Sequence, residues 1–133
     1  MLIQPLLDKL VQLRLPAFRE GLQEQLKNPQ YTDLAFEERL ALLVDMEVTR
    51  RHDRRIQRLT QMAAFPQSAT LEDLDLSASR GLERRFVLEL AQGNWIDQHL
   101  NTLVLGPTGS GKSFLSCVLG LSACRTNHSV RYF

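Results

Sequence analysis

The sequence lacks long apolar runs and any recognisable export signal. None of its hydrophobic stretches approaches the roughly 18 residues that a membrane-spanning helix needs. Residues 1–15 have Asp8, Lys9 and Arg14 among their apolar positions and contain no small-residue cleavage site, so they do not match a secretory signal. We therefore expect a soluble, cytoplasmic protein with no membrane partner.

Cysteine and histidine are also scarce. Cys117 and Cys124 are the only cysteines, and seven residues of helix would separate them by about 10 Å along the axis, which is too far for a disulfide. The three histidines, His52, His99 and His128, have no companion ligands at the spacing of a metal site. The sequence therefore predicts reduced cysteines and no metal site built on histidine.

The net charge is small, at +1 for the whole chain, but the charges are unevenly distributed. One short segment contains five arginines, and Asp53 is the only acidic residue among them. The arginines are Arg50, Arg51, Arg54, Arg55 and Arg58. On a helix the first, third and fifth of these share one face, and the other two lie on the adjacent row. Arginine suits bidentate phosphate contacts, so this stripe predicts binding to the DNA backbone, largely indifferent to base sequence. The alternative is a solvated face with pairs such as Glu47 and Arg51.

Helical periodicity dominates the first 62 residues. Residues 2–15 have apolar side chains at helical spacing, and a second helix is predicted from Pro16 to the breaker Asn28-Pro29. A third helix is predicted from Thr32, as its N-cap, to about Met62. The sequence thus predicts an α-rich amino-terminal module over residues 1–62.

The rest of the chain has the pattern of a linker followed by the start of an α/β domain. Turn-forming residues predict a mostly extended linker over residues 63–80. The elements predicted after it are a helix over 82–92 ended by Gly93, a short apolar strand over 101–105, a helix over 112–125 and a second strand over 129–133. Residues 81–133 therefore predict one βαβ unit of a P-loop domain, with the remainder of the parallel sheet missing from this chain.

A glycine-rich loop connects the predicted strand to the predicted helix. Its sequence GPTGSGKS fits the phosphate-loop (Walker A) pattern at Gly106, Gly111, Lys112 and Ser113. The predicted nucleotide-binding residues are Gly106, Pro107, Thr108, Gly109, Ser110, Gly111, Lys112 and Ser113. Backbone N–H groups at a helix start can surround phosphate oxygens, the lysine would reach the β- and γ-phosphates, and the serine hydroxyl would ligate Mg²⁺. The alternative is a glycine-rich turn that binds nothing.

Hydrolysis would require further groups that the sequence does not supply. A Walker-B acid and a residue that positions water are both needed, and no acidic residue follows the loop. Residues 42–47, LLVDME, resemble an apolar strand ending in acids, but their apolar positions continue the helical period from Phe36 to Val48. We therefore predict no catalytic residue and do not expect this chain to hydrolyse ATP alone.

Several segments carry a broader resemblance. They are LDKLVQLRL, DLAFEERLALLVD, RRIQRL, TLEDLDL, RGLERRFVLELAQGNWI and NTLVLGPTGSGKSFLSCVLGLSACR, which together span nearly the whole chain. This pattern resembles the IstB-like helper ATPases of IS21-type insertion sequences, which are AAA+ proteins related to bacterial helicase loaders. The resemblance implies a helical module before an AAA+ domain that binds Mg-ATP, assembles as a homo-oligomer on DNA and promotes transposition with the transposase of the same insertion sequence.

The resemblance also has consequences for the linker and for the end of the chain. In AAA+ proteins the segment before the first core strand lies near the adenine, which implies base contacts around Leu71 to Leu76. Relatives of this kind continue through Walker B, sensor residues, an arginine finger and a lid, so we expect the chain to be the amino-terminal part of such a protein. Two alternatives remain: a helicase-loader-like replication protein, or an inert fragment in which only the helical DNA- or partner-binding module folds.

Overall fold

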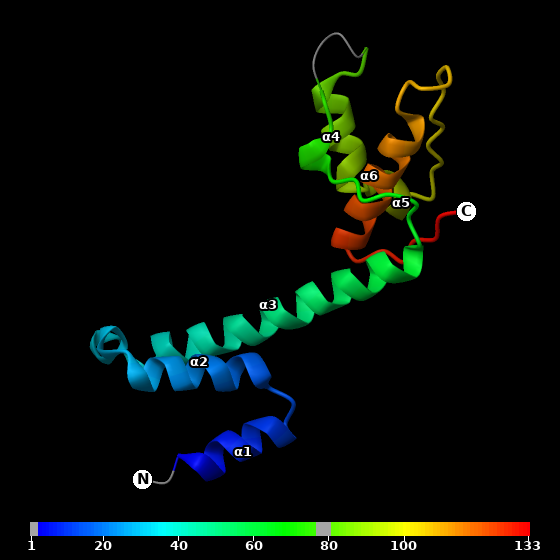
Figure 1. Cartoon of the computed structure of the whole chain (residues 1–133). Helices are drawn as coiled ribbons and strands as arrows, with labels where there is room; N and C mark the ends of the chain where they lie inside the picture. The colour runs from blue at the N-terminus through cyan, green and yellow to red at the C-terminus, as the bar shows by residue number, and fades with distance from the viewer. Residues whose placement is uncertain (1–2, 77–80) are drawn as a thin grey trace. The chain divides into compact units, whose positions relative to one another are not determined.

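The computed structural model describes residues 3–76 and 81–133, and helices make up most of that part of the chain (Figure 1). Contacts divide the chain into two compact units, Met1–Arg54 and Arg55–Phe133. The division falls within α3, a continuous helix over Phe36–Ala63. Each unit has buried residues of its own.

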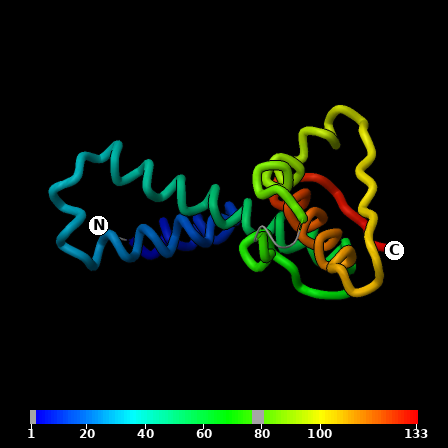
Figure 2. The backbone as a smooth tube through the Cα atoms, turned by 90° about the horizontal axis from the view of Figure 1, so that it is seen from above, coloured from blue at the N-terminus to red at the C-terminus, as the bar shows by residue number. Residues whose placement is uncertain are grey.

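The first unit consists of α1 (Gln4–Gln12), α2 (Pro16–Lys27), the 3-10 helix η1 (Pro29–Asp33) and the first part of α3. Proline stands in the first turn of both α1 and α2, where its missing N–H costs no helical hydrogen bond. The chain reverses at η1, and α3 returns beside α2 (Figure 2). The predicted helices of the first module are confirmed.

The start of α3 differs from the prediction. Thr32 does not cap it, because this residue lies inside η1 and its hydroxyl donates a 2.6 Å hydrogen bond to the Pro29 carbonyl. Asn28 caps η1 instead, since its side-chain oxygen accepts from the backbone N–H of Gln30 at 3.0 Å. A local hydrogen bond within the turn thus replaces the expected helix cap.

Contact between α2 and α3 is close at one glycine. A Cβ built on Gly21 would lie 2.6 Å from the Met46 sulfur and 2.8 Å from a methyl of Leu43. Gln25, one turn further along α2, is buried and exchanges hydrogen bonds with Arg39 through both the backbone carbonyl and the side chain. The two helices therefore pack through a small residue and a satisfied buried amide.

The second unit is organised around α6 (Lys112–Arg125). Six residues of this helix are buried: Leu115, Cys117, Val118, Ser122, Ala123 and Cys124. They are joined by Val87 and Ala91 of α4 (Arg84–Gln92), by Leu59 and Ala63 at the end of α3, and by Ala69 before the 3-10 helix η2 (Leu71–Asp73). The predicted helices over residues 82–92 and 112–125 are confirmed.

Glycine sets the end of α4 as the sequence predicts. Gly93 follows Gln92 in the left-handed region, with φ of 79°, and its N–H donates to the Leu90 carbonyl. A residue with a side chain would be strained there. A short helix, α5 (Asn94–Asp97), follows at once where the sequence predicts no helix.

The predicted βαβ unit is not seen. Residues 101–105 and 129–133 form neither helix nor strand, and no strand occurs elsewhere in the described residues. A strand exists by bonding to a neighbouring strand, and these two segments exchange no backbone hydrogen bond; the Tyr132 N–H donates to the Ala63 carbonyl instead. Leu103 and Leu105 are correspondingly 82% and 87% exposed. The expectation of an α-rich first module is right, and that of a βαβ unit is wrong for this structure.

Candidate functional site

The glycine loop of residues 106–113 leads directly into α6. Lys112 is the first residue of that helix, and Gly111 precedes it as the N-cap with φ of 94°. Gly109 also has a positive φ, 83°, so two of the loop's backbone conformations favour glycine. At Gly106 a Cβ would approach the Ser110 hydroxyl oxygen to 2.8 Å. The loop sequence is therefore explained by its backbone geometry.

The lysine of the loop lies against the loop's first residue. Its ammonium donates a 2.5 Å hydrogen bond to the Gly106 carbonyl, six residues earlier. Gly111 and Lys112 are half-buried, whereas the other residues of the loop are exposed. The structure thus brings together the two ends of the predicted phosphate loop through the side chain expected to contact phosphate.

The amino terminus of α6 has no neutralising side chain among the described residues. No side chain caps the helix, and no acidic residue stands in its first turn. The first N–H groups of any helix have no partner within the helix, and the helix dipole adds positive potential there. The Ser113 hydroxyl is exposed and makes no hydrogen bond within the described residues. This end of α6 is therefore suited to an anion.

Close packing holds α6 in place. A Cβ built on Gly120 would overlap the ring of Phe65, because it would lie 2.7 Å or less from two of the ring carbons. Phe65 packs edge-on against Tyr132, with ring centroids 6.4 Å apart.

The cysteines of α6 are buried within this packing. Burial raises the pKa of the Cys124 thiol, and a hydrogen bond with the Thr60 side chain lowers it by a smaller amount. Both cysteines are free and buried, as expected for the reduced cysteines that the sequence predicts.

The arginine stripe on α3 begins with two residues that are tied to a buried carboxylate. Glu47 accepts hydrogen bonds from the backbone N–H groups of Ala17 (2.9 Å) and Phe18 (3.1 Å) at the start of α2. Arg50 and Arg51 lie 3.2 Å and 3.5 Å from the same carboxylate, which confirms the predicted pairing of Glu47 with Arg51. One acidic side chain therefore anchors the start of α2 and two arginines at once.

Glu47 stays charged despite its burial. Desolvation acts to raise its pKa, but the backbone N–H of Phe18, the charge of Arg50 and the backbone N–H of Ala17 outweigh it. The net effect holds the pKa of Glu47 below its ordinary value of 4.5. Nothing in the sequence alone indicated the contacts with α2, because they join residues 30 positions apart.

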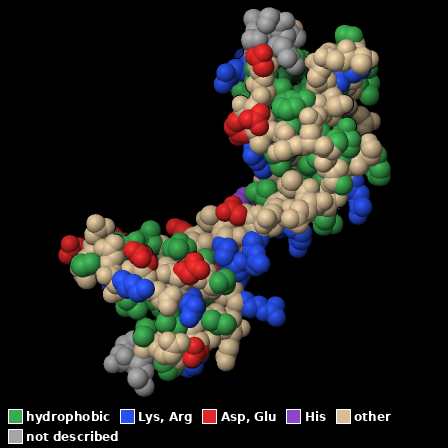
Figure 3. All heavy atoms as spheres, viewed as in Figure 1, with side chains coloured by type: hydrophobic (Ala, Val, Ile, Leu, Met, Phe, Trp, Pro, Cys, Tyr) green, Lys and Arg blue, Asp and Glu red, His purple; other side chains and the backbone are tan. Residues whose placement is uncertain are grey.

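The other three arginines of the stripe, Arg54, Arg55 and Arg58, are exposed. They make no hydrogen bond or ion pair within the described residues. Figure 3 shows Lys and Arg side chains gathered along the middle of α3 on the face turned to the viewer. Within the described residues, the stripe therefore contains two arginines with partners and three without.

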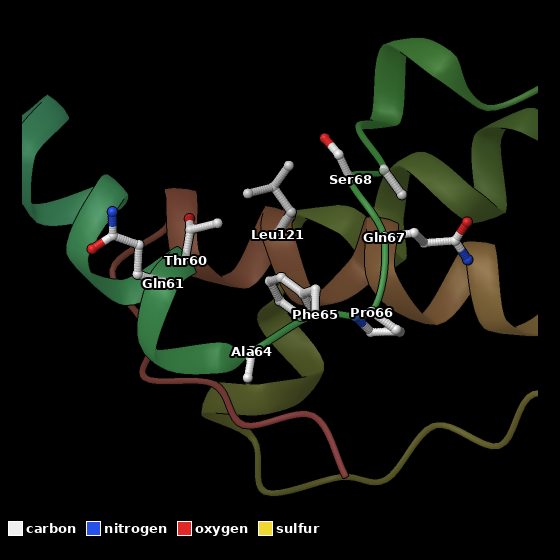
Figure 4. A pocket seen from close by; sticks show the side chains of 9 residues that line it. Thr60, Gln61, Ala64, Phe65, Pro66, Gln67, Ser68 and Leu121 are labelled. Atoms are coloured by element: carbon white, nitrogen blue, oxygen red, sulfur yellow. The ribbon is translucent and has the colours of Figure 1, made fainter.

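At least three surface pockets lie in the described part of the second unit, and two of them have volumes of about 410 Å³ or more. Leu71, Leu74 and Leu76, the segment expected to contact a base, line one of about 490 Å³ together with Glu72, Arg84 and Leu88. The other, of about 410 Å³, lies between the end of α3, residues 65–69 and Leu121 (Figure 4). Its lining contains hydroxyl and amide groups but no charged side chain, so it does not suit a phosphate.

Two structural features are absent from the parts of the chain that are described, residues 3–76 and 81–133. No helix there is long and apolar enough to cross a membrane. No group of three or more His, Cys, Asp or Glu side chains is placed to hold a metal ion.

Comparison with known proteins identifies the family. The family described as "IstB-like ATP binding protein" matches residues 8–133. The chain is 44% identical over 133 residues to the "Insertion sequence IS1162 putative ATP-binding protein" of Pseudomonas fluorescens, covering 99% of this chain and 58% of that protein. It is 39% identical over 132 residues to "Putative insertion sequence ATP-binding protein y4pL" of Sinorhizobium fredii, covering 99% of this chain and 54% of that protein.

A more distant relative is also matched along nearly the whole of this chain. The "Insertion sequence IS21 putative ATP-binding protein" of Pseudomonas aeruginosa is 31% identical over 130 residues, which cover 98% of this chain and 48% of that protein. The chain thus spans about half the length of the curated relatives that it matches. The match nonetheless includes the helices of the first unit as well as the glycine loop. On these grounds the chain belongs to the IstB-like ATP-binding protein family of insertion sequences.

Proposed function

We propose that this chain binds Mg-ATP through residues 106–113. The observation that carries the proposal is the geometry of the loop: Gly111 caps α6 in a left-handed conformation, and Lys112 opens the helix with its ammonium returned to Gly106. Membership of an ATP-binding family supports ATP as the ligand. The uncapped start of α6 supports an anion at this position.

Each part of the loop has a role in this proposal. Backbone N–H groups from Gly109 to Ser113 surround phosphate oxygens, and Lys112 exchanges the Gly106 carbonyl for the β- and γ-phosphates. The Ser113 hydroxyl would hold Mg²⁺, whose positive charge would help to neutralise the phosphates. The leucines of residues 71–76 contact the base. We assign no catalytic residue, so the proposed activity of this chain is binding without turnover.

We further propose that the chain acts within a larger transposition assembly. Its relatives are named as insertion-sequence proteins, which supports a transposase of the same element as partner. We propose a homo-oligomer as the working form. The exposed arginines of α3 support contact with the DNA backbone. In this proposal residues 1–62 form the partner- and DNA-binding module, 63–80 the linker and 81–133 the nucleotide-binding part.

A titration of a fluorescent ATP analogue with Mg²⁺ tests the nucleotide proposal. We expect saturable binding by the wild-type chain and affinity at least about tenfold weaker in Lys112→Ala, because a hydrogen bond to a charged group is worth about 1.5–3 kcal/mol. Lys27→Ala removes an exposed lysine from α2 and is the matched control, with affinity expected to be unchanged. Ser113→Ala should weaken the dependence on Mg²⁺ specifically.

Circular dichroism shows whether each variant is folded. A folded wild-type chain that does not bind the analogue, or a Lys112→Ala variant that binds as tightly as Lys27→Ala, contradicts the proposal.

A further inference from the structure

The five arginines of α3 are equivalent in the sequence pattern but differ in their contacts. We propose that Arg54, Arg55 and Arg58 are the residues of this helix that bind duplex DNA phosphates. Arg50 and Arg51 instead pair with Glu47, the residue of α3 that bonds to α2, and make no phosphate contact. The inference rests on the proposed association with DNA and assigns the residues responsible for it.

Arg50 and Arg51 are committed to a buried partner. Both guanidinium groups lie against the carboxylate of Glu47, which is itself 5% exposed and already accepts two backbone hydrogen bonds from α2. Arg51 also donates to the Arg14 carbonyl, at 3.4 Å. Moving either arginine to a phosphate would leave the buried carboxylate with less compensating charge, which is costly. These two side chains are therefore structural.

Arg54, Arg55 and Arg58 have no such commitment. All three are exposed, and none has a hydrogen bond or ion pair within the described residues. Asp53, the acidic residue within the same segment, forms no ion pair with them there. Their binding to a phosphate would break no existing contact. Free guanidinium groups are also the ones that can release counterions from DNA on binding.

The spacing of the three residues suits one stretch of a phosphate backbone. Arg54 and Arg58 are four residues apart, which places them on one face about 6 Å apart along the helix axis. Arg55 lies on the adjacent row. The group depends only on the local geometry of α3, which is continuous over Phe36–Ala63. Three long, forked donors within one turn can engage neighbouring phosphates without reading bases.

Salt dependence separates phosphate contacts from other effects of charge. Each phosphate neutralised by a protein lowers the slope of log K against log salt concentration by about 0.9 on duplex DNA. The experiment is fluorescence anisotropy of a labelled duplex with the whole 133-residue chain, at salt concentrations between about 50 and 200 mM. Two duplexes of unrelated sequence should give the same slope.

Three variants are compared with the wild type. The triple variant Arg54→Gln, Arg55→Gln, Arg58→Gln should reduce the magnitude of the slope by about 2.7, corresponding to three lost contacts. The double variant Arg50→Gln, Arg51→Gln should keep the wild-type slope while its urea midpoint falls. A control triple, Lys27→Gln, Arg85→Gln, Arg131→Gln, removes the same charge from exposed sites outside α3 and should keep the slope.

The outcomes are distinguishable. A wild-type slope in the first triple variant overturns the inference, and so does an equal reduction in the control triple, which would mean that net charge alone matters. A reduced slope in a folded double variant overturns the division between the two groups. If the wild-type chain does not bind duplex at all, the DNA part of the proposed function fails together with this inference, while Mg-ATP binding is judged by its own titration.

Discussion

The interior of each unit is stabilised by a different kind of contact. In the first unit the interior includes two buried polar side chains, Gln25 and Glu47, and both bond across from one helix to another. Among the described residues of the second unit, Ser122 is the one buried polar side chain, and its hydroxyl donates to the Val118 carbonyl of its own helix. Polar contacts between helices thus contribute to the interior of the first unit, whereas the interior of the second unit depends mainly on the close packing of apolar side chains.

This difference in interior contacts corresponds to a difference in the candidate binding groups that the two units expose. The first unit keeps two arginines of α3 occupied by anchoring them to Glu47, so charge there has a structural as well as a surface role. The second unit fixes α6 by packing, which leaves the polar start of that helix and its glycine loop exposed. We therefore expect the first unit to respond most to charge and pH, and the second most to added or removed methyl groups.

The largest expected effect is the loss of the buried carboxylate. Glu47→Ala should destabilise the first unit by about 3 kcal/mol, because the N–H groups of Ala17 and Phe18 and two arginines lose a shared acceptor. The measurement is urea unfolding followed by far-UV circular dichroism. Glu24→Ala removes an exposed glutamate from α2 and is the matched control. Equal midpoints for the two variants would contradict the polar account of this unit.

A smaller effect is expected from overfilling the second unit. Gly120→Ala places a methyl group against the ring of Phe65 and should cost about 2 kcal/mol in the same unfolding experiment. Gly21→Ala is the comparison in the first unit. There the new methyl meets the flexible end of Met46 and a terminal methyl of Leu43, which can shift more easily than an aromatic ring, and both variants gain the same helix propensity. Gly120→Ala should therefore be the less stable variant; the reverse order would break the contrast between the units.

The smallest expected effect is the pH dependence of stability, which tests the role of the Glu47 charge in the first unit. The folded pKa of Glu47 lies below 4.5, so its stabilising contribution is complete above the unfolded pKa. That contribution is lost as the pH falls below 4.5 and through the folded pKa. Wild-type stability should therefore decline more steeply than that of Glu47→Gln in unfolding measurements at successive acidic pH values. Parallel curves for the two proteins would show that this carboxylate does not contribute as described.

Much of the helical fold could be predicted from local patterns. Apolar spacing, Pro16 and Gly93 located the helices and their ends because these signals act within a few residues. The strands could not be predicted in the same way. Residues 101–105 and 129–133 have an apolar pattern that suits a strand, but a strand requires a bonded neighbour that is not formed here.

The candidate site was predictable to a similar degree. The phosphate-loop pattern located the loop and its lysine because spacing within one turn determines that geometry. The division of the arginines was not predictable beyond the pairing of Glu47 with Arg51. It depends on the packing of α2 against α3, which brings Ala17 to Glu47 from 30 residues away. Close approach at Gly120 likewise depends on Phe65, from another part of the chain.

The most direct test of the central claim, that the glycine loop binds Mg-ATP, is a titration of the ¹⁵N-labelled chain observed by NMR. The account predicts that Mg-ATP shifts the backbone amide signals of Gly109 to Ser113 most strongly, and that a folded Lys112→Ala variant needs at least about tenfold more Mg-ATP to reach the same shifts. Shifts concentrated elsewhere, or loop shifts that saturate at the same Mg-ATP concentration in Lys112→Ala as in the wild type, would contradict it.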